Sequence, residues 1–162
     1  MTKYQGYFID LDGTMYKGKE KIPAAPRFIN RLRAAGKRVM FVTNNSTKTP
    51  AAVAANLREN HGIAAEASEV YTTALATADY LKEQVGDRPK TAYVIGETGL
   101  KQALTAAGFT LTDQQPTFVV VGLDTQVTYA KFETAVLNIL NGATFIGTNA
   151  DSNLPNERGL TP

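Results

Sequence analysis

The chain alternates short runs of β-branched and aromatic residues with longer segments of helical periodicity. This alternation predicts an α/β fold with a parallel sheet, because parallel strands need helical crossovers between them. Strands are predicted in the segments GYFIDL, KRVMFVTN, TAYVIG, TFVVVGL and ATFIGTN. Helices are predicted over residues 24–36, 49–62, 73–86, 98–108 and 128–142. In the last of these segments, one apolar helix face comprises Phe132, Ala135, Val136, Ile139 and Leu140.

A change of composition divides this pattern into two α/β series. Turn-forming residues gather in the segment GDRPK, so we predict a boundary near Leu81–Lys90. One domain is expected over residues 1–80 and a second over residues 81–162. The first series has only two predicted strands with their helices, which would make a thin sheet, so we expect something else to complete it.

Composition excludes several classes of function. The chain has no cysteine, so disulfides, thiolate catalysis and zinc–thiolate sites are excluded. The net charge of +2 is small and dispersed, which argues against a nucleic-acid partner. No stretch approaches the roughly 20 apolar residues of a membrane span, and the N-terminus MTKYQGYFID lacks the apolar segment of a secretory signal. We therefore predict a soluble, cytoplasmic protein.

Two aspartates, Asp10 and Asp12, lie at the end of the first predicted strand. Parallel α/β sheets bind ligands outside the carboxyl ends of their strands. Two nearby carboxylates repel, so both stay ionised only if a cation lies between them or one is protonated. Magnesium suits such oxygen ligands. The structural alternative is an ordinary turn, since Asp and Gly often end strands.

The second predicted strand ends in hydroxyl and amide side chains, in the segment FVTNNS. Such side chains, together with backbone N–H groups before a helix, can bind a phosphate group. The structural alternative is a simple loop with an Asx turn. Acids after one strand and phosphate-type donors after the next favour a functional site over two unrelated turns.

The motif DLDGTMYKG followed by VTNNS closely resembles the haloacid dehalogenase superfamily of phosphatases. Within it, the chain resembles the NagD-like, or p-nitrophenyl phosphatase-like, branch, as do the segments YVIGETGL, VVVGLD and TNADSNLP. The resemblance implies a parallel Rossmann-like core, incomplete in this chain, with an inserted α/β cap domain. Residues 1–80 would be the N-terminal half of the core, and residues 81–162 the cap, incomplete at its C-terminal end.

The resemblance also implies roles for individual residues. Asp10 would be the nucleophile that forms an aspartyl phosphate, and Asp12 would be the general acid and base. Magnesium would be held by the Asp10 carboxylate and the Asp12 backbone carbonyl. The phosphate and substrate would be bound by Gly13, Thr43, Asn44 and Asn45.

The chain departs from the family pattern after the cap. The family has a later lysine and a later Gly-Asp motif that completes the metal site. Gly86-Asp87 lies at the predicted domain boundary and cannot serve as that metal-binding motif. Lys90, Lys101 and Lys131 lie within the predicted cap and are poor substitutes for the later lysine. We therefore expect an N-terminal portion of a longer enzyme, and we expect the missing ligand to weaken magnesium binding and turnover by this chain.

The predicted function is magnesium-dependent hydrolysis of small phosphorylated metabolites, either sugar phosphates or nucleoside monophosphates. One alternative is a phosphotransferase or mutase on the same core, in which a sugar hydroxyl replaces water. Another is a binding module without catalysis. No nucleic-acid or membrane partner is expected, and a homo-oligomer is one alternative for the assembly.

Four further features of the sequence lie outside the predicted catalytic motifs. VIGETGL lacks the full dinucleotide-binding motif and predicts a tight turn. His61 precedes Gly62 at a predicted helix end, where a partly charged imidazole would favour the helix dipole. The family resemblance implies that the segment Met15–Pro23 forms a flap with Gly18 at its turn. A loop that either faces substrate or only turns the chain contains Asn149, Asp151 and Asn153.

Overall fold

The computed structural model describes residues 4–151, 154–156 and 159–161, and their contacts form two compact units. The first unit takes in the described residues of Met1–Thr43, Pro50–Tyr71 and Asp151–Pro162. The second takes in Asn44–Thr49 and Thr72–Ala150. The change of unit at Thr72 lies earlier than the boundary predicted near Leu81–Lys90, because helix α3 packs into the core of the second unit.

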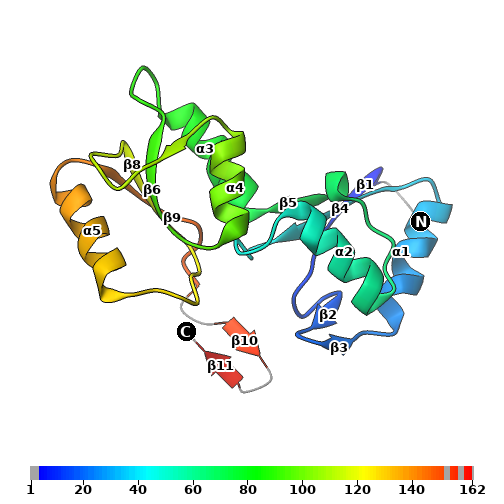
Figure 1. Ribbon diagram of the computed structural model, residues 1–162. Helices are drawn as coiled ribbons and strands as arrows, with labels where there is room; N and C mark the ends of the chain where they lie inside the picture. Colours follow the sequence, from blue (N-terminus) through cyan, green and yellow to red (C-terminus); the bar gives the residue numbers. More distant parts are fainter. Residues whose placement is uncertain (1–3, 152–153, 157–158, 162) are drawn as a thin grey trace. The chain divides into compact units, whose positions relative to one another are not determined.

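The first unit contains a three-stranded sheet in the order β1-β4-β5 (Figure 1). Its strands are β1 (Gly6–Asp10), β4 (Arg38–Thr43) and β5 (Val70–Thr72). β1 and β4 run parallel, with Asp10 aligned with Val42. The first two strands are those predicted from the sequence, and the sequence analysis missed β5.

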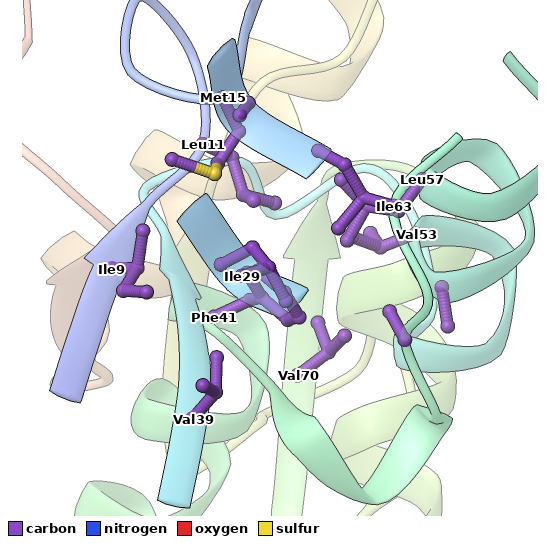
Figure 2. Packing of buried hydrophobic residues seen from close by; sticks show 13 residues of the cluster. Ile9, Leu11, Met15, Ile29, Val39, Phe41, Val53, Leu57, Ile63 and Val70 are labelled. Carbon is purple, nitrogen blue, oxygen red and sulfur yellow. The ribbon is translucent and has the colours of Figure 1, made fainter. Parts of the chain in front are cut away.

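Helices α1 (Ala24–Ala34) and α2 (Pro50–His61) cover one face of this sheet. Figure 2 shows side chains from both helices packed against Ile9, Val39 and Phe41 of the strands. Alternate residues of a strand point to opposite faces, and Phe8 of β1 is 84% exposed on the other face. The described sheet is therefore covered on one side, and β1 lies at its edge.

The shorter elements of the first unit include two pairs of antiparallel strands. β2 (Tyr16–Lys17) pairs with β3 (Glu20–Lys21) in the segment predicted to form a flap. Gly18 has a φ of +57° at the turn, as the prediction required. The other short elements are the 3₁₀ helix Ala67–Glu69 and the strands β10 (Leu154–Asn156) and β11 (Gly159–Thr161), which pair with each other.

The second unit contains a parallel sheet in the order β7-β6-β8-β9. The strands are β6 (Thr91–Ile95), β7 (Thr110–Leu111), β8 (Phe118–Val121) and β9 (Thr144–Gly147). Helices α3 (Thr73–Gln84) and α4 (Thr98–Ala106) pack on one face, and α5 (Tyr129–Leu140) packs on the other. The α/β class with parallel sheets is therefore confirmed, with β7 as the strand that the sequence analysis missed here.

Helix α5 buries less of its apolar face than an amphipathic helix usually does. Ala135 is buried and Ile139 is partly buried against the sheet. Phe132, Val136 and Leu140 are 49%, 52% and 77% exposed.

In the described part of the chain, no helix combines the length and the hydropathy that crossing a membrane requires.

Candidate active site

The residues after β1 form a tight turn held by backbone hydrogen bonds. The N–H groups of Thr14 and Met15 donate to the Leu11 carbonyl, at 3.1 and 2.8 Å. The N–H of Gly13 donates to the Tyr16 carbonyl at 2.7 Å. Gly13 has a φ of +80°, a conformation that side-chain-bearing residues rarely adopt. The turn therefore depends on glycine at this position.

Both predicted catalytic aspartates, Asp10 and Asp12, are exposed, while Leu11 between them is buried. Leu11 is fully buried and Met15 is 5% exposed, both in the core of the first unit (Figure 2). Asp10 and Asp12 on either side of Leu11 are exposed. The Thr14 hydroxyl donates a hydrogen bond to Oδ2 of Asp10 at 3.2 Å. An exposed carboxylate held in this way can reach a substrate.

Thr43 lies at the same edge of the sheet as the aspartates. It is the last residue of β4 and is 4% exposed. Because β1 and β4 are parallel neighbours and Asp10 aligns with Val42, the carboxyl ends of the two strands lie side by side. The structure thus brings together, within the first unit, Asp10, Asp12, Gly13 and Thr43.

Asn44 and Asn45 follow Thr43 directly and belong to the second unit. The Asn44 carbonyl accepts a hydrogen bond from Nδ2 of Asn149 at 3.2 Å. Oδ1 of Asn45 accepts hydrogen bonds from the N–H and the hydroxyl of Thr47, at 2.8 and 2.6 Å. This is the Asx turn that the structural alternative anticipated, so the Asn45 carbonyl oxygen serves the shape of the loop.

Tyr16 and His61 stack on each other beside the turn, with ring centroids 4.4 Å apart and an interplanar angle of 16°. Burial raises the pKa of Tyr16 to about 12, and the carboxylates of Asp12 and Asp10 add to this effect. Burial lowers the pKa of His61, Lys21 lowers it further, and Asp12 opposes the change. The lowered pKa favours the neutral imidazole, which is the opposite direction from the partly charged group expected at the helix end.

Tyr16 was not singled out in the sequence, although it lies close to both aspartates. Its position four residues after Asp12, in the predicted flap, was the available signal. In the structure Asp12 also forms a β-bridge with Tyr16. The phenol therefore belongs to the surroundings of the candidate site.

The turn supplies oxygen donors that fit magnesium in kind. Asp10 and Asp12 are exposed acidic residues, and magnesium is bound through one or two carboxylates with waters in the remaining positions. Among the residues that the structure describes, no three acidic, histidine or cysteine side chains form a cluster that could hold a metal ion. The turn thus accounts for part of a magnesium site.

Of the remaining sequence features, VIGETGL lies in the second unit, and TNADSNLP passes from the second unit to the first at Asp151. Within TNADSNLP, Asn149 contacts the Asn44 carbonyl, whereas Asn153 lies outside the described residues. The segment VIGETGL forms the connection from β6 to α4, as the tight-turn interpretation predicts. Glu97 in this connection accepts hydrogen bonds from the N–H and hydroxyl of Thr125, at 3.2 and 2.7 Å.

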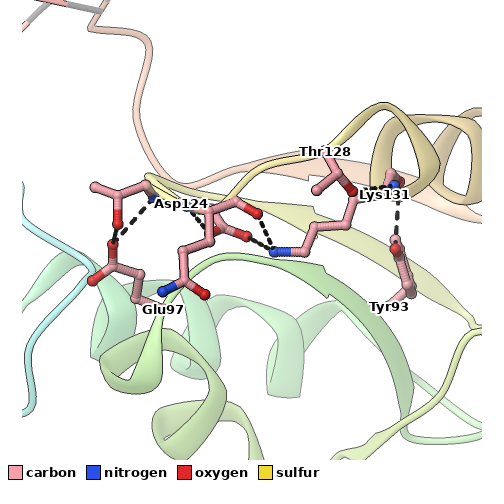
Figure 3. Close-up of polar contacts among 7 residues, drawn as sticks. Tyr93, Glu97, Asp124, Thr128 and Lys131 are labelled. Carbon is pink, nitrogen blue, oxygen red and sulfur yellow. Dashed lines mark hydrogen bonds and ion pairs between the residues drawn. The ribbon is translucent and has the colours of Figure 1, made fainter.

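Lys131 is engaged in a polar network of the second unit (Figure 3). Its Nζ lies 2.6 Å from Oδ2 of Asp124 and 2.8 Å from the Gln126 carbonyl. The Asp124 side chain is 5% exposed. Burial alone would raise the pKa of Asp124, but hydrogen bonds from Lys131 and the Gln126 N–H outweigh it and lower that pKa. Lys131 therefore balances a buried carboxylate of its own unit.

Comparison with known proteins identifies the family. Residues 7–110 match the model of the haloacid dehalogenase-like hydrolases. An acid sugar phosphatase from Staphylococcus aureus is 51% identical over 163 residues, covering all of this chain and 62% of the relative. The chain thus spans less than two thirds of the length of that curated relative.

Solved structures agree in sequence and in fold. A mutant of the thermostable p-nitrophenylphosphatase from Bacillus stearothermophilus is 47% identical, with a TM-score of 0.84 over all of this chain and 62% of the other. A glycerol phosphate phosphatase from Mycobacterium tuberculosis, solved in complex with magnesium, is 32% identical, with a TM-score of 0.90 over 99% of this chain and 48% of the other. These matches confirm the predicted resemblance: the chain belongs to the haloacid dehalogenase-like hydrolases.

Proposed function

We propose that the protein is a cytoplasmic phosphatase that hydrolyses phosphomonoesters of small metabolites, with sugar phosphates as the first class to test. The observation that carries this proposal is the pair of exposed aspartates on either side of the buried Leu11, beside the end of β4 with Thr43. The names of the relatives support it, since they are phosphatases of sugar, nitrophenyl and glycerol phosphates.

The chemistry would proceed in two displacements. The Asp10 carboxylate attacks phosphorus, the ester P–O bond breaks, and an aspartyl phosphate forms while Asp12 gives its proton to the leaving oxygen. Asp12 then takes a proton from a water molecule, which attacks the same phosphorus. Inorganic phosphate leaves and both carboxyl groups return to their starting state. The exposure of both side chains supports these roles.

Charge neutralisation and positioning complete the proposed site. Magnesium, held by the Asp10 carboxylate and the Asp12 backbone carbonyl, would neutralise charge on the transferred phosphoryl group. Thr43 would donate its hydroxyl to a phosphoryl oxygen, and its burial at the strand end restricts its orientation. Gly13, which has a left-handed φ and no side chain, would let the phosphate approach the turn closely.

The test is a phosphatase assay with p-nitrophenyl phosphate and a panel of sugar phosphates. It is run on the 162-residue chain and on a version extended by the C-terminal region of the Staphylococcus aureus relative. Asp10→Asn should reduce turnover by roughly 10⁴-fold or more, as removal of a nucleophile does elsewhere. Its thermal unfolding should stay unchanged, because Asp10 is exposed.

The matched control is Asp87→Asn, which changes an exposed aspartate of the second unit. Acid quenching should trap phosphate on the wild-type protein and not on Asp10→Asn. Comparable activity of Asp10→Asn and wild type would refute the nucleophile assignment. An isomerised sugar phosphate in place of free phosphate would show mutase chemistry instead, and phosphate binding without product would indicate a binding module.

A further inference from the structure

The carboxyl edge of the second sheet has the arrangement that binds ligands in open α/β sheets. Such ligands bind where the strand order reverses. In the order β7-β6-β8-β9, the chain leaves β6 for β7 on one side and continues to β8 on the other, so the reversal lies between β6 and β8. The Gly122 N–H donates to the Ile95 carbonyl at 2.8 Å. Figure 3 shows Glu97, which follows β6, beside the segment that follows β8.

The chain's own segment 44–49 lies against this edge. The Gly99 N–H, at the start of α4, donates to the Thr47 carbonyl at 2.9 Å. A Cβ atom added to Gly99 would lie 2.5 Å from the Lys48 carbonyl oxygen and 2.7 Å from that of Ser46. The loop backbone therefore packs directly on Gly99, and any side chain there would displace it.

Gly122, after β8, contacts the same loop. A Cβ atom added to Gly122 would lie 2.7 Å from Oγ of Ser46. Ser46 is 1% exposed, and its hydroxyl has no hydrogen-bond partner among the described residues. Neither Gly99 nor Gly122 has a left-handed φ. Glycine is therefore needed at position 99 for space rather than for backbone conformation, because backbone atoms lie close to it. At Gly122 the close atoms are side-chain atoms of Ser46 and Thr148, so a side chain there would displace these two side chains.

We propose that Gly99 and Gly122 are positioning residues that seat the loop 44–49, so that the second unit sets the positions of Asn44 and Asn45. This inference rests on the proposed function together with the phosphate-binding role that the family resemblance implies for these two residues. Thr43 belongs to the first unit and Asn44 to the second. The loop 44–49 and the two glycines that contact it thus belong to the same unit.

The test compares Gly99→Ala and Gly122→Ala with Gly147→Ala as the matched control. A Cβ atom at Gly147 meets only the Asn149 carbonyl oxygen, at an ordinary 3.6 Å. In ¹⁵N-edited NMR spectra of the chain, both test variants should shift the amide signals of Asn44 and Asn45, whereas the control leaves them in place. Circular dichroism verifies that each variant is folded.

A compensating change makes the test specific. Ser46→Ala removes the nearest atom that a methyl group at position 122 would meet and leaves the Thr148 side chain, at 3.1 Å, as the remaining close neighbour. The double variant Ser46→Ala/Gly122→Ala should therefore return the Asn44 and Asn45 signals toward their wild-type positions. If the glycine variants do not fold, hydrogen exchange in the wild type tests the inference instead. A loop that packs stably on Gly99 requires the Gly99 N–H to exchange as slowly as the amides of the β6 core.

Activity supplies a second readout. Gly122→Ala should lower kcat/KM by roughly 10- to 100-fold, since a misplacement of about 1 Å can cost about 10²-fold. Most of the loss should appear as a higher KM, because the loop donors bind substrate and transition state alike. A merely structural role would lower the amount of active protein at unchanged KM. The double variant should regain most of the loss.

The two hypotheses fail in different ways. Absence of phosphatase activity from both the 162-residue chain and the extended version refutes the proposed function, and the NMR signals of Asn44 and Asn45 still show whether the two glycines position the loop. Wild-type positions of the Asn44 and Asn45 signals in folded Gly99→Ala and Gly122→Ala overturn the inference, whatever the activity. Rapid exchange of the Gly99 N–H in the wild type overturns it as well.

Discussion

Replacing Lys131 by methionine tests the polar network of the second unit. The Asp124 side chain is only 5% exposed. After the substitution, its carboxylate keeps the hydrogen bond from the Gln126 N–H but loses its ion pair with Lys131. Removing one partner of a fully buried ion pair costs about 3–5 kcal/mol. The Lys131 side chain is 32% exposed, so water already screens the pair and we expect a smaller loss, of about 2 kcal/mol. In a unit of this size that lowers the thermal midpoint by about 8–16 °C.

Hydrogen exchange measured amide by amide is the suitable assay. The chain has two units, so a single melting curve does not isolate one of them. Slowly exchanging amides of β8 should lose about 2 kcal/mol of protection in Lys131→Met. The control is Lys101→Met, because Lys101 is exposed and acts on Asp124 only through its charge. Equal losses in both variants would refute the assignment of Lys131 as the partner of a buried carboxylate.

Three further predictions concern the two cores. The free energy of unfolding of the first unit should fall as the pH drops below about 6.5, because His61 binds a proton more readily in the unfolded state than when it is buried. His61→Phe should reduce this pH dependence, as measured by denaturant titrations at several pH values. Phe41→Ala should cost about 3–5 kcal/mol, since Phe41 is fully buried, whereas Phe8→Ala at an exposed position should change the free energy of unfolding by less than about 0.5 kcal/mol. Thr72→Ala should cost the second unit about 1 kcal/mol by removing the side chain that caps α3, and Thr72→Ser should restore it; equal exchange protection in both variants would contradict this.

Helical periodicity predicted where helices form but not how much of each is covered. The residues of α5 were grouped correctly on one side of a helix, yet Phe132 and Leu140 are largely exposed. Periodicity shows which side chains share a face, whereas burial depends on what packs against that face. The strands β5 and β7 were missed because runs of three and two residues are too short to show alternation.

The candidate site was predictable as far as it is local in sequence. Asp10, Asp12 and Thr43 end neighbouring parallel strands, and the position of strand ends follows from the α/β pattern. The packing of Gly99 against the loop 44–49 was not predictable, because it joins segments about 50 residues apart that share no motif. The stacking of Tyr16 on His61 was hidden for the same reason.

Among the strands that the structure describes, none pairs with the outer edge of β1, and the ring of Phe8 on that strand is exposed. A strand edge of this kind is a template for pairing with another polypeptide, and an apolar side chain beside it strengthens such pairing. Concentrated preparations of the chain should accordingly self-associate through β1, so dilute, low-temperature handling is needed before any kinetic comparison is meaningful.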